Sequence, residues 1–180
     1  MPANMKGTIA MNFLEMAKKK DIDKITVKEL AENCNISRQS FYYHFQDIYG
    51  VLEWTINRIV KITVDYSLTA ESAKTAMRIL FFMVVDNREA FAKMLSSQRR
   101  DIIEKVMVNG MRKYIRTLLL RKAGDKELDL KKHEAQIDFC VYGIMGFMLK
   151  CAVQKRVDLD MLSAQMVEIL ERQLSGILAD

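Results

Sequence analysis

The sequence has little proline and little glycine: it contains one Pro and seven Gly in 180 residues. These residues supply most of the turns between short strands, so their scarcity argues against a sandwich or barrel of many strands. Half of the residues are hydrophobic and 28% are charged, which excludes a disordered chain. Met, Leu, Ala, Lys and Glu are abundant, as is typical of helices. The composition therefore predicts an all-α protein.

Cysteine and histidine are also scarce. The three Cys (Cys34, Cys140 and Cys151) are scattered and form no CxxC pair, which argues against a disulfide framework. With only His44 and His133 in addition, we expect no metal site and no cofactor. No nucleophile, base or phosphate-binding loop stands at a catalytic spacing, so we predict that the protein is not an enzyme. Each Cys is interpreted as a small core residue, with redox sensing as the alternative.

Long apolar runs are missing as well. No uncharged apolar stretch reaches 18 residues, and the longest, residues 139–149, is too short to span a bilayer. The N-terminus does not have the pattern of a signal peptide, so we expect a cytoplasmic protein with no membrane partner. The net charge of +5 permits nucleic-acid binding without indicating it. Residues 1–61 hold nine basic and seven acidic residues, so DNA binding would depend on where the charges lie.

Apolar periodicity predicts helices along most of the chain. They are expected at residues 5–20, 27–33, 37–45, 48–68, 72–85, 88–97, 99–122, 132–155 and 159–178. Thr26 and Glu29 have the spacing of a capping box, and Ser37 and Asp47 are candidate N-caps of later helices. Gly124 and the charged run after it form the one clear loop of the second half.

Two short helices joined by a tight turn are the signature of a helix-turn-helix. Here they are residues 27–33 and 37–45, and Asn35 between them tolerates the left-handed backbone that such a turn needs. The sequence predicts a DNA-binding domain at residues 1–47 and a larger helical domain at residues 48–180.

The helix at residues 37–45 is the most informative segment. Phe41 and Phe45 are four residues apart and share one face, which can anchor the helix in a core. Its other side chains can all form hydrogen bonds. Arg38 and Gln39 suit guanine and adenine edges in a major groove, and Tyr hydroxyls can contact phosphates. The alternative is a solvated polar helix.

The segment Thr26-Val-Lys-Glu-Leu-Ala-Glu-Asn-Cys-Asn-Ile-Ser-Arg-Gln-Ser-Phe-Tyr-Tyr-His-Phe45 resembles the DNA-binding domain of the TetR/AcrR repressor family. The resemblance covers about residues 5–60. The run Phe41-Tyr-Tyr-His-Phe-Gln-Asp-Ile-Tyr49 followed by Leu52-Glu-Trp54 is similar to a subgroup labelled dihydroxyacetone kinase regulators. Many family members have Gly where this chain has Asn35, and a phosphate-contacting Lys where it has Ile48.

The resemblance implies that Thr26 and Lys28 lie at the DNA backbone and that Arg38 and its neighbours face the groove. His44 is interpreted either as a phosphate contact or as a packing residue. The predicted DNA-binding residues are Thr26, Lys28, Ser37, Arg38, Gln39, Ser40, Tyr42, Tyr43 and His44.

The resemblance also implies that the last two helices form a homodimer, and the alternative is packing within one protomer. Met and aromatic residues of the middle helices are either ordinary core or the wall of a small-molecule pocket, whose position the sequence does not predict. The predicted dimer residues are Ile137, Cys140, Val141, Ile144, Met148, Leu162, Met166, Ile169 and Leu170. The middle set is Phe81, Phe82, Met83, Phe91, Met94, Met107, Met111 and Tyr114.

The sequence therefore predicts a homodimeric transcriptional regulator that binds a palindromic operator on double-stranded DNA. We expect a repressor that an unidentified small-molecule effector releases from DNA. The alternative is a protein of the same fold that acts as a co-activator or interaction protein through a protein partner.

Overall fold

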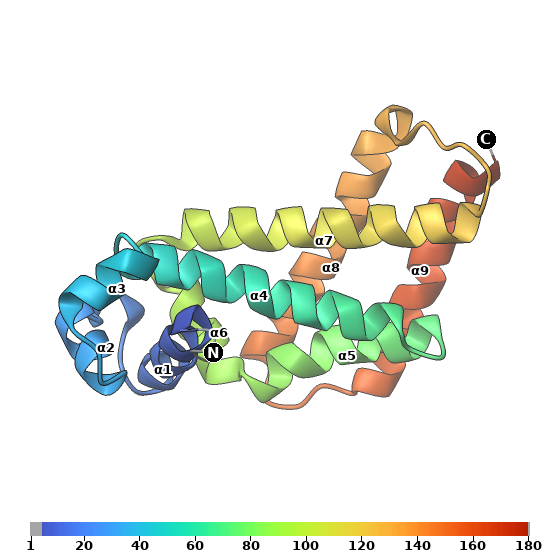
Figure 1. The fold of residues 1–180 in the computed structure, drawn as a ribbon. Helices are drawn as coiled ribbons and strands as arrows, with labels where there is room; N and C mark the ends of the chain where they lie inside the picture. The colour runs from blue at the N-terminus through green and yellow to red at the C-terminus, as the bar shows by residue number, and fades with distance from the viewer. Residues whose placement is uncertain (1–4, 180) are drawn as a thin grey trace. The chain divides into compact units, whose positions relative to one another are not determined.

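The computed structural model describes residues 5–179, and within them it contains nine α-helices, two short 3-10 turns and no strand (Figure 1). This confirms the predicted all-α fold. The elements are α1 (Met5–Lys19), η1 (Ile22–Lys24), α2 (Val27–Asn33), α3 (Arg38–His44), α4 (Ile48–Leu68), α5 (Ala73–Asp86), α6 (Arg88–Leu95), α7 (Arg100–Ala123), η2 (Leu130–His133), α8 (Glu134–Val153) and α9 (Leu159–Ala179).

The chain folds into two compact units that are not continuous in sequence. The first comprises residues up to 59 together with 89–106, and the second comprises residues 60–88 together with 107 onward. Helices α4 and α7 are unbroken, and each contributes to both units. The predicted domain boundary between residues 47 and 48 marks the end of the helix-turn-helix motif, whereas the two compact units divide the chain at other residues. The division into domains 1–47 and 48–180 stays a prediction.

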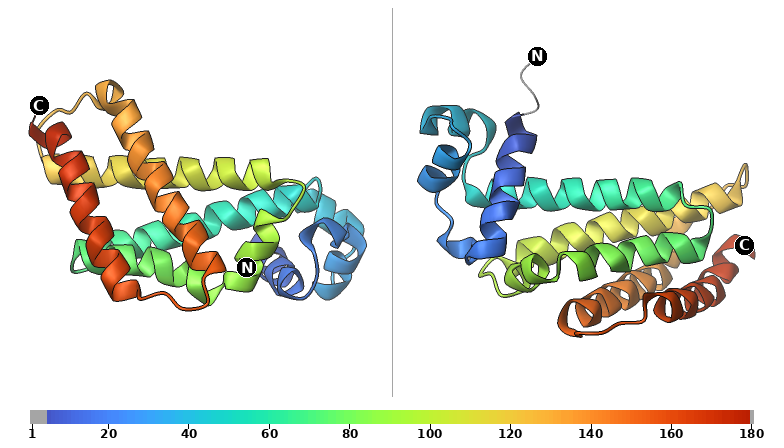
Figure 2. Two further views of the ribbon diagram at one scale, coloured as in Figure 1. Left: turned by 180° about the vertical axis from the view of Figure 1, so that it is seen from behind. Right: turned by 90° about the horizontal axis from the view of Figure 1, so that it is seen from below.

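The first unit is built around α1, α2 and α3, which contact one another in chain order (Figure 2). Its core contains Ile9 and Phe13 of α1, Leu30 of α2 and Phe41 of α3, all fully buried. The segment before α7 is fastened to this core by polar contacts. The Asp23 carboxylate accepts hydrogen bonds from the Ser97 hydroxyl at 2.9 Å and the Gln98 backbone N–H at 3.0 Å.

The second unit has α5 packed against α8 and α9. Ion pairs join α7 to α8: Arg112 Nε lies 2.8 Å from Asp138 Oδ1, and Arg116 pairs with Glu134. By length and composition, residues 130–153 could cross a membrane. Eight side chains of α8 lie in the core of this unit, whereas Phe139, Tyr142 and Val153 are exposed.

Helical spacing in the sequence predicts an apolar stripe on α4 made of Val51, Leu52, Thr55, Ile59 and Ile62. Val51, Leu52 and Thr55 are buried as expected, but Ile62 is 41% exposed. Thr63 and Ser67 are buried instead. A search for apolar periodicity does not select these two residues, because they are polar. A local hydrogen bond makes the burial of Ser67 possible, since its hydroxyl donates to the Val64 carbonyl.

Candidate nucleic-acid interface

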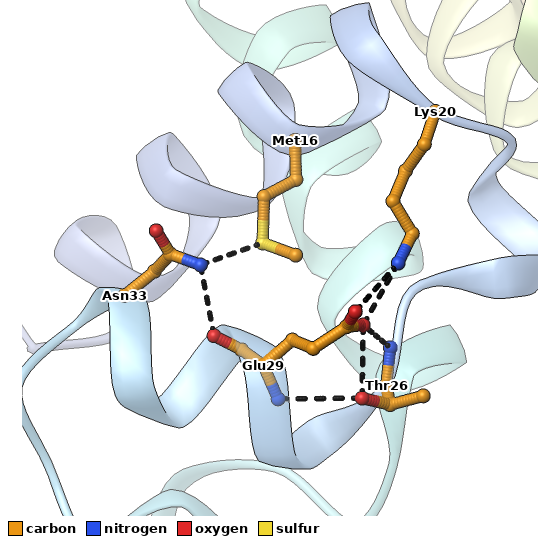
Figure 3. Close-up of polar contacts among 5 residues, drawn as sticks. All are labelled: Met16, Lys20, Thr26, Glu29 and Asn33. Atoms are coloured by element: carbon orange, nitrogen blue, oxygen red, sulfur yellow. Dashed lines mark hydrogen bonds and ion pairs between the residues drawn. The ribbon is translucent and has the colours of Figure 1, made fainter.

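Helix α2 begins at a complete capping box, as the sequence predicted (Figure 3). The Glu29 backbone N–H donates to Thr26 Oγ1 at 3.3 Å, and the Glu29 carboxylate accepts from the Thr26 backbone N–H at 3.1 Å. Lys20 Nζ donates to both Glu29 carboxylate oxygens, at 2.9 and 2.8 Å. Hydrogen bonding to Lys20, followed by bonds from Thr26, lowers the pKa of Glu29 to about 2. Thr26 is thereby committed to the cap, and its predicted DNA contact stays a prediction.

The turn between α2 and α3 has a defined hydrogen-bond pattern. Asn35 has a φ of 54°, the left-handed value predicted for it. The backbone N–H of Asn35 donates to Glu32, and that of Ile36 donates to Ala31, at 3.1 and 3.0 Å. This is the Schellman arrangement that ends helices at a left-handed residue. It fixes where α3 starts relative to α2, which is what a helix-turn-helix requires.

Helix α3 presents a polar face and hides an aromatic one. Phe41 is fully buried and Phe45, just after the helix, is 7% exposed, with their ring centroids 6.1 Å apart. Ser37 caps the helix by accepting from the Ser40 backbone N–H at 3.1 Å. The predicted anchoring face and N-cap are therefore confirmed. The aromatic anchor holds the opposite face of a short helix toward solvent.

The residues predicted to read bases lie on that solvent face. Arg38 and Gln39 are exposed in the first turn of α3, and neither side chain is engaged with any other described residue. Tyr42 and Tyr43 are 56% and 86% exposed. Most of the Tyr43 side chain is therefore in contact with solvent and not with the rest of the protein. These side chains are thus available to a ligand.

For His44, the sequence left two alternatives open, a phosphate contact and a packing residue. It is half-buried, and its ring packs edge-on against Tyr43 with centroids 5.1 Å apart. His44 thus packs beside an exposed tyrosine, and its contact with a phosphate stays a prediction.

The start of α4 carries the main departure from the pattern that the resemblance implies. Ile48, where many TetR/AcrR proteins have Lys, is only 8% exposed. Asp47 caps the helix, as predicted, by accepting from the Gly50 backbone N–H at 2.7 Å. An apolar side chain in the core cannot contact a phosphate, so any backbone contact at this point must come from elsewhere.

Three lysines of the first unit differ in their availability. Lys28 is exposed on α2 without an ion-pair partner among the described residues. Lys24 pairs with Asp21 at 2.8 Å, and Lys6 Nζ lies 5.4 Å from the centroid of the Phe45 ring. Lys28 is therefore the lysine best placed for a phosphate. The Lys6 contact was missed in the sequence because the two residues are far apart along the chain.

The cysteines show no sign of activation. Cys140 and Cys151 are buried and Cys34 is half-buried, and burial raises the pKa of each thiol. Thiols with raised pKa values are mostly protonated at neutral pH and react slowly. Among residues 5–179, no group of three or more His, Cys, Asp and Glu lies close enough to hold a metal ion.

The predicted dimer residues mostly lie inside the second unit. Leu162 and Leu170 are half-buried, and Ile169 is 44% exposed. The other six, from Ile137 to Met166, are buried within the protomer. Helical spacing alone does not say which of two apolar faces points inward. The outward face of α8 carries Phe139, Tyr142 and Val153, which the sequence analysis did not select, beside Gly143 and Gly146, whose small size predicts the close approach of another helix.

The Met and aromatic set of the middle helices is mostly core. Phe81, Met94, Met107 and Met111 are buried, and Phe82 is 46% exposed. Tyr114 lines the cavity of the second unit that is described below.

The capped α2, the left-handed turn and the aromatic anchor of α3 define a helix-turn-helix with a polar, unengaged recognition face. An all-α body follows this helix-turn-helix. Residues 14–53 match the sequence model of the family described as bacterial regulatory proteins, tetR family. The matched segment contains the helix-turn-helix, so this part of the chain is similar to the DNA-binding part of that family, as the sequence resemblance predicted.

A curated relative carries the same kind of segment. The chain is 34% identical over 53 residues to the "Uncharacterized HTH-type transcriptional regulator YxbF" of Bacillus subtilis (strain 168). The match covers 29% of this chain and 14% of that protein, so the chain matches only a small part of its relative.

Solved structures share the fold over nearly the full length. The "Dihydroxyacetone kinase operon activator DhaS" superposes with a TM-score of 0.74 over 97% of this chain and 98% of that one, at 16% identity. A tetR-family transcriptional regulator from Streptomyces coelicolor gives 0.69 over 99% and 84%, at 14% identity. At such identities the likeness is one of fold.

Proposed function

We propose that this protein is a cytoplasmic, homodimeric repressor that binds a palindromic operator through α3 and leaves it when a small molecule binds the second unit. The observation that carries the DNA-binding part is the exposed and unengaged pair Arg38 and Gln39 in the first turn of α3. Arg can bind guanine and Gln adenine with two hydrogen bonds each, which requires side chains that are not already paired.

Operator binding is tested with the full chain and the DNA upstream of its own gene, by fluorescence anisotropy. Replacing Arg38 or Gln39 by Ala should each weaken specific binding by about 1–3 kcal/mol, or about fivefold to more than a hundredfold. Lys113→Ala is the control: it removes an exposed charge on α7, away from α3, and should leave the affinity for DNA unchanged. Unaltered binding by both α3 variants would refute the assignment.

Phosphate contacts are tested by the salt dependence of the same assay. With about four to eight phosphates contacted by a dimer, affinity should fall steeply as salt rises. Lys28→Ala should weaken binding to all sequences alike and make the salt slope shallower by about one contact per protomer. An affinity for DNA that does not change with salt concentration would contradict contacts between lysines and phosphates.

For the dimer we propose the outward face of α8, with exposed residues of α9 beside it. Phe139 and Tyr142 are 63% and 60% exposed, and Ile169 on α9 is 44% exposed. A Cβ added at Gly143 or Gly146 would meet nothing within 4 Å in the protomer. Large apolar side chains around a groove of glycines suit a second helix at close range, and a two-fold axis would bring two copies of α8 together.

The dimer is tested by filling that groove. Gly146→Leu has room in the protomer, so its helix content should be unchanged while sedimentation shows a shift from dimer to monomer. Lys113→Leu, at an exposed position of α7 outside the proposed interface, is the control and should remain dimeric. A dimer undisturbed by Gly146→Leu would place the interface elsewhere.

Transcription with purified polymerase measures whether the protein represses or activates its target. A repressor should lower transcript from its own upstream region, and the effector should restore it. The alternative, action through a protein partner, is favoured by the buried Ile48, which removes one expected phosphate contact. DNA binding that occurs only when a partner protein is added would establish that alternative.

A further inference from the structure

The second unit contains a cavity of about 290 Å³ between α5, α7, α8 and α9. Its wall is almost wholly apolar, and Tyr114 and Ile115 at its base are nearly fully buried. The lining side chains are Ala73, Ala76, Met77, Tyr114, Ile115, Leu118, Leu119, Lys122, Ile144, Val167, Leu170, Glu171, Leu174, Ser175 and Leu178. None of the site residues predicted for DNA binding is among them.

The few polar groups of the wall are already satisfied. The Tyr114 side chain is 1% exposed and its hydroxyl lies near Ser67, and the Ser175 hydroxyl donates to the Arg172 carbonyl at 3.0 Å. Lys122 Nζ lies 3.8 Å from Glu171 Oε1, and both side chains are more than half exposed. Their charges cancel at the solvent side of the cavity. A polar or charged ligand would therefore find no free partner in it and would lose its hydration.

The volume sets the size of the occupant. An apolar cavity of about 150 Å³ stays free of water and accommodates benzene, which has six carbon atoms. A cavity of about twice that volume accommodates about twelve carbon atoms in proportion. The wall offers water few hydrogen bonds, so an apolar molecule that displaces this water from the cavity gains free energy.

We infer that this cavity is the binding site of an uncharged, largely hydrocarbon molecule of about ten to twelve non-hydrogen atoms. In the proposed function, on which the inference rests for its biological role, this molecule is the effector. The binding itself involves no DNA. It can therefore be measured separately from operator binding, and the two proposals can fail independently.

Calorimetry and thermal unfolding of the full chain test the inference with four probes. Naphthalene has the inferred size, benzene is smaller, pyrene is larger, and 2-naphthoate adds a negative charge to the naphthalene ring. We expect naphthalene to bind most tightly and to raise the melting temperature. We expect at least tenfold weaker binding of 2-naphthoate. No binding of naphthalene, or tighter binding of 2-naphthoate, would overturn the inference.

A filled-cavity variant locates the binding. Leu174→Trp, in the α9 wall, should weaken naphthalene binding at least tenfold. Leu120→Trp is the matched control, because Leu120 is 50% exposed on α7 and does not line the cavity. Ala76→Leu, in the α5 wall, is a second filling variant in case Leu174→Trp does not fold. Naphthalene affinity that both filling variants leave unchanged would place the bound molecule outside this cavity.

Discussion

The edge of the Trp54 ring packs against Phe45, with ring centroids 6.0 Å apart and planes at 75°. Phe45 ends the recognition helix α3, and Trp54 is on α4 within the same compact unit. Trp54 is also the one tryptophan in the sequence. Intrinsic fluorescence therefore reports directly on the packing of the residue that holds α3 in place.

Shortening Phe45 should loosen this anchor. Phe45→Ala removes a nearly buried ring and should lower the free energy of unfolding by about 3–5 kcal/mol, whereas Phe45→Leu should cost less. The emission of Trp54 should shift to longer wavelength as water reaches the indole. Urea unfolding followed by fluorescence measures both effects. Tyr43→Ala, at a residue 86% exposed, is the control, and an equal loss of stability there would contradict the assignment.

The left-handed backbone at Asn35 predicts an unusual order of substitutions. Asn35→Ala should destabilise the protein by about 1–2 kcal/mol, because Asn, with its short polar side chain, tolerates a positive φ better than Ala does. Asn35→Gly should be nearly neutral, since relief of that strain is offset by greater freedom of the unfolded chain. Chemical denaturation checks both, with Glu32→Ala on the neighbouring helix as a control. Equal stability of the Ala and Gly variants would show that the turn is not strained.

The capping box should make stability sensitive to acid. The pKa of Glu29 is about 2 in the folded protein against an ordinary value of 4.5, so folding favours its ionised form. Its contribution is complete above about pH 4.5 and is lost as the pH falls toward 2. Melting temperatures should therefore fall less over this range for Glu29→Gln than for the wild type.

A second variant checks the cause of that shift. Lys20→Met removes the largest contribution and should move the titration of Glu29, followed by NMR, to higher pH. Because the pair is partly exposed, 1 M salt should weaken the effect of Lys20. A Glu29 titration that is the same with and without Lys20 would contradict this explanation.

Gly110 is required by a close approach of two helices in the second unit. A Cβ at this position of α7 would overlap the Cγ1 methyl of Val60 on α4. Overpacking in Gly110→Ala should therefore lower the free energy of unfolding by about 1–3 kcal/mol. The higher helix propensity of Ala offsets only roughly 1 kcal/mol of this loss.

A double-mutant cycle tests the contact. Val60→Ala should relieve the overlap, so the double variant should be more stable than the sum of the single changes predicts. Gly176→Ala is the control, because nothing lies within 4 Å of its added Cβ, and it should be neutral or stabilising. Additive losses in the cycle would remove Val60 as the cause.

Local features of this protein were determined by the sequence itself. The capping box at Thr26, the cap at Asp47, the turn at Asn35 and the buried pair Phe41 and Phe45 depend on residues within five positions of one another. Such patterns can be read along the chain, because the physics of caps, turns and helix faces acts over one or two helical turns.

Relations between distant residues were decided only by the tertiary structure. Apolar residues cover two sides of α8, and packing against α5 and α9 selected the Ile137 side as core and left Phe139 outside. The cavity beside Tyr114 needs four helices to exist, and the contact of Gly110 with Val60 joins segments fifty residues apart. No spacing within one helix encodes these, because a hydrophobic pattern states that a face is buried and not what buries it.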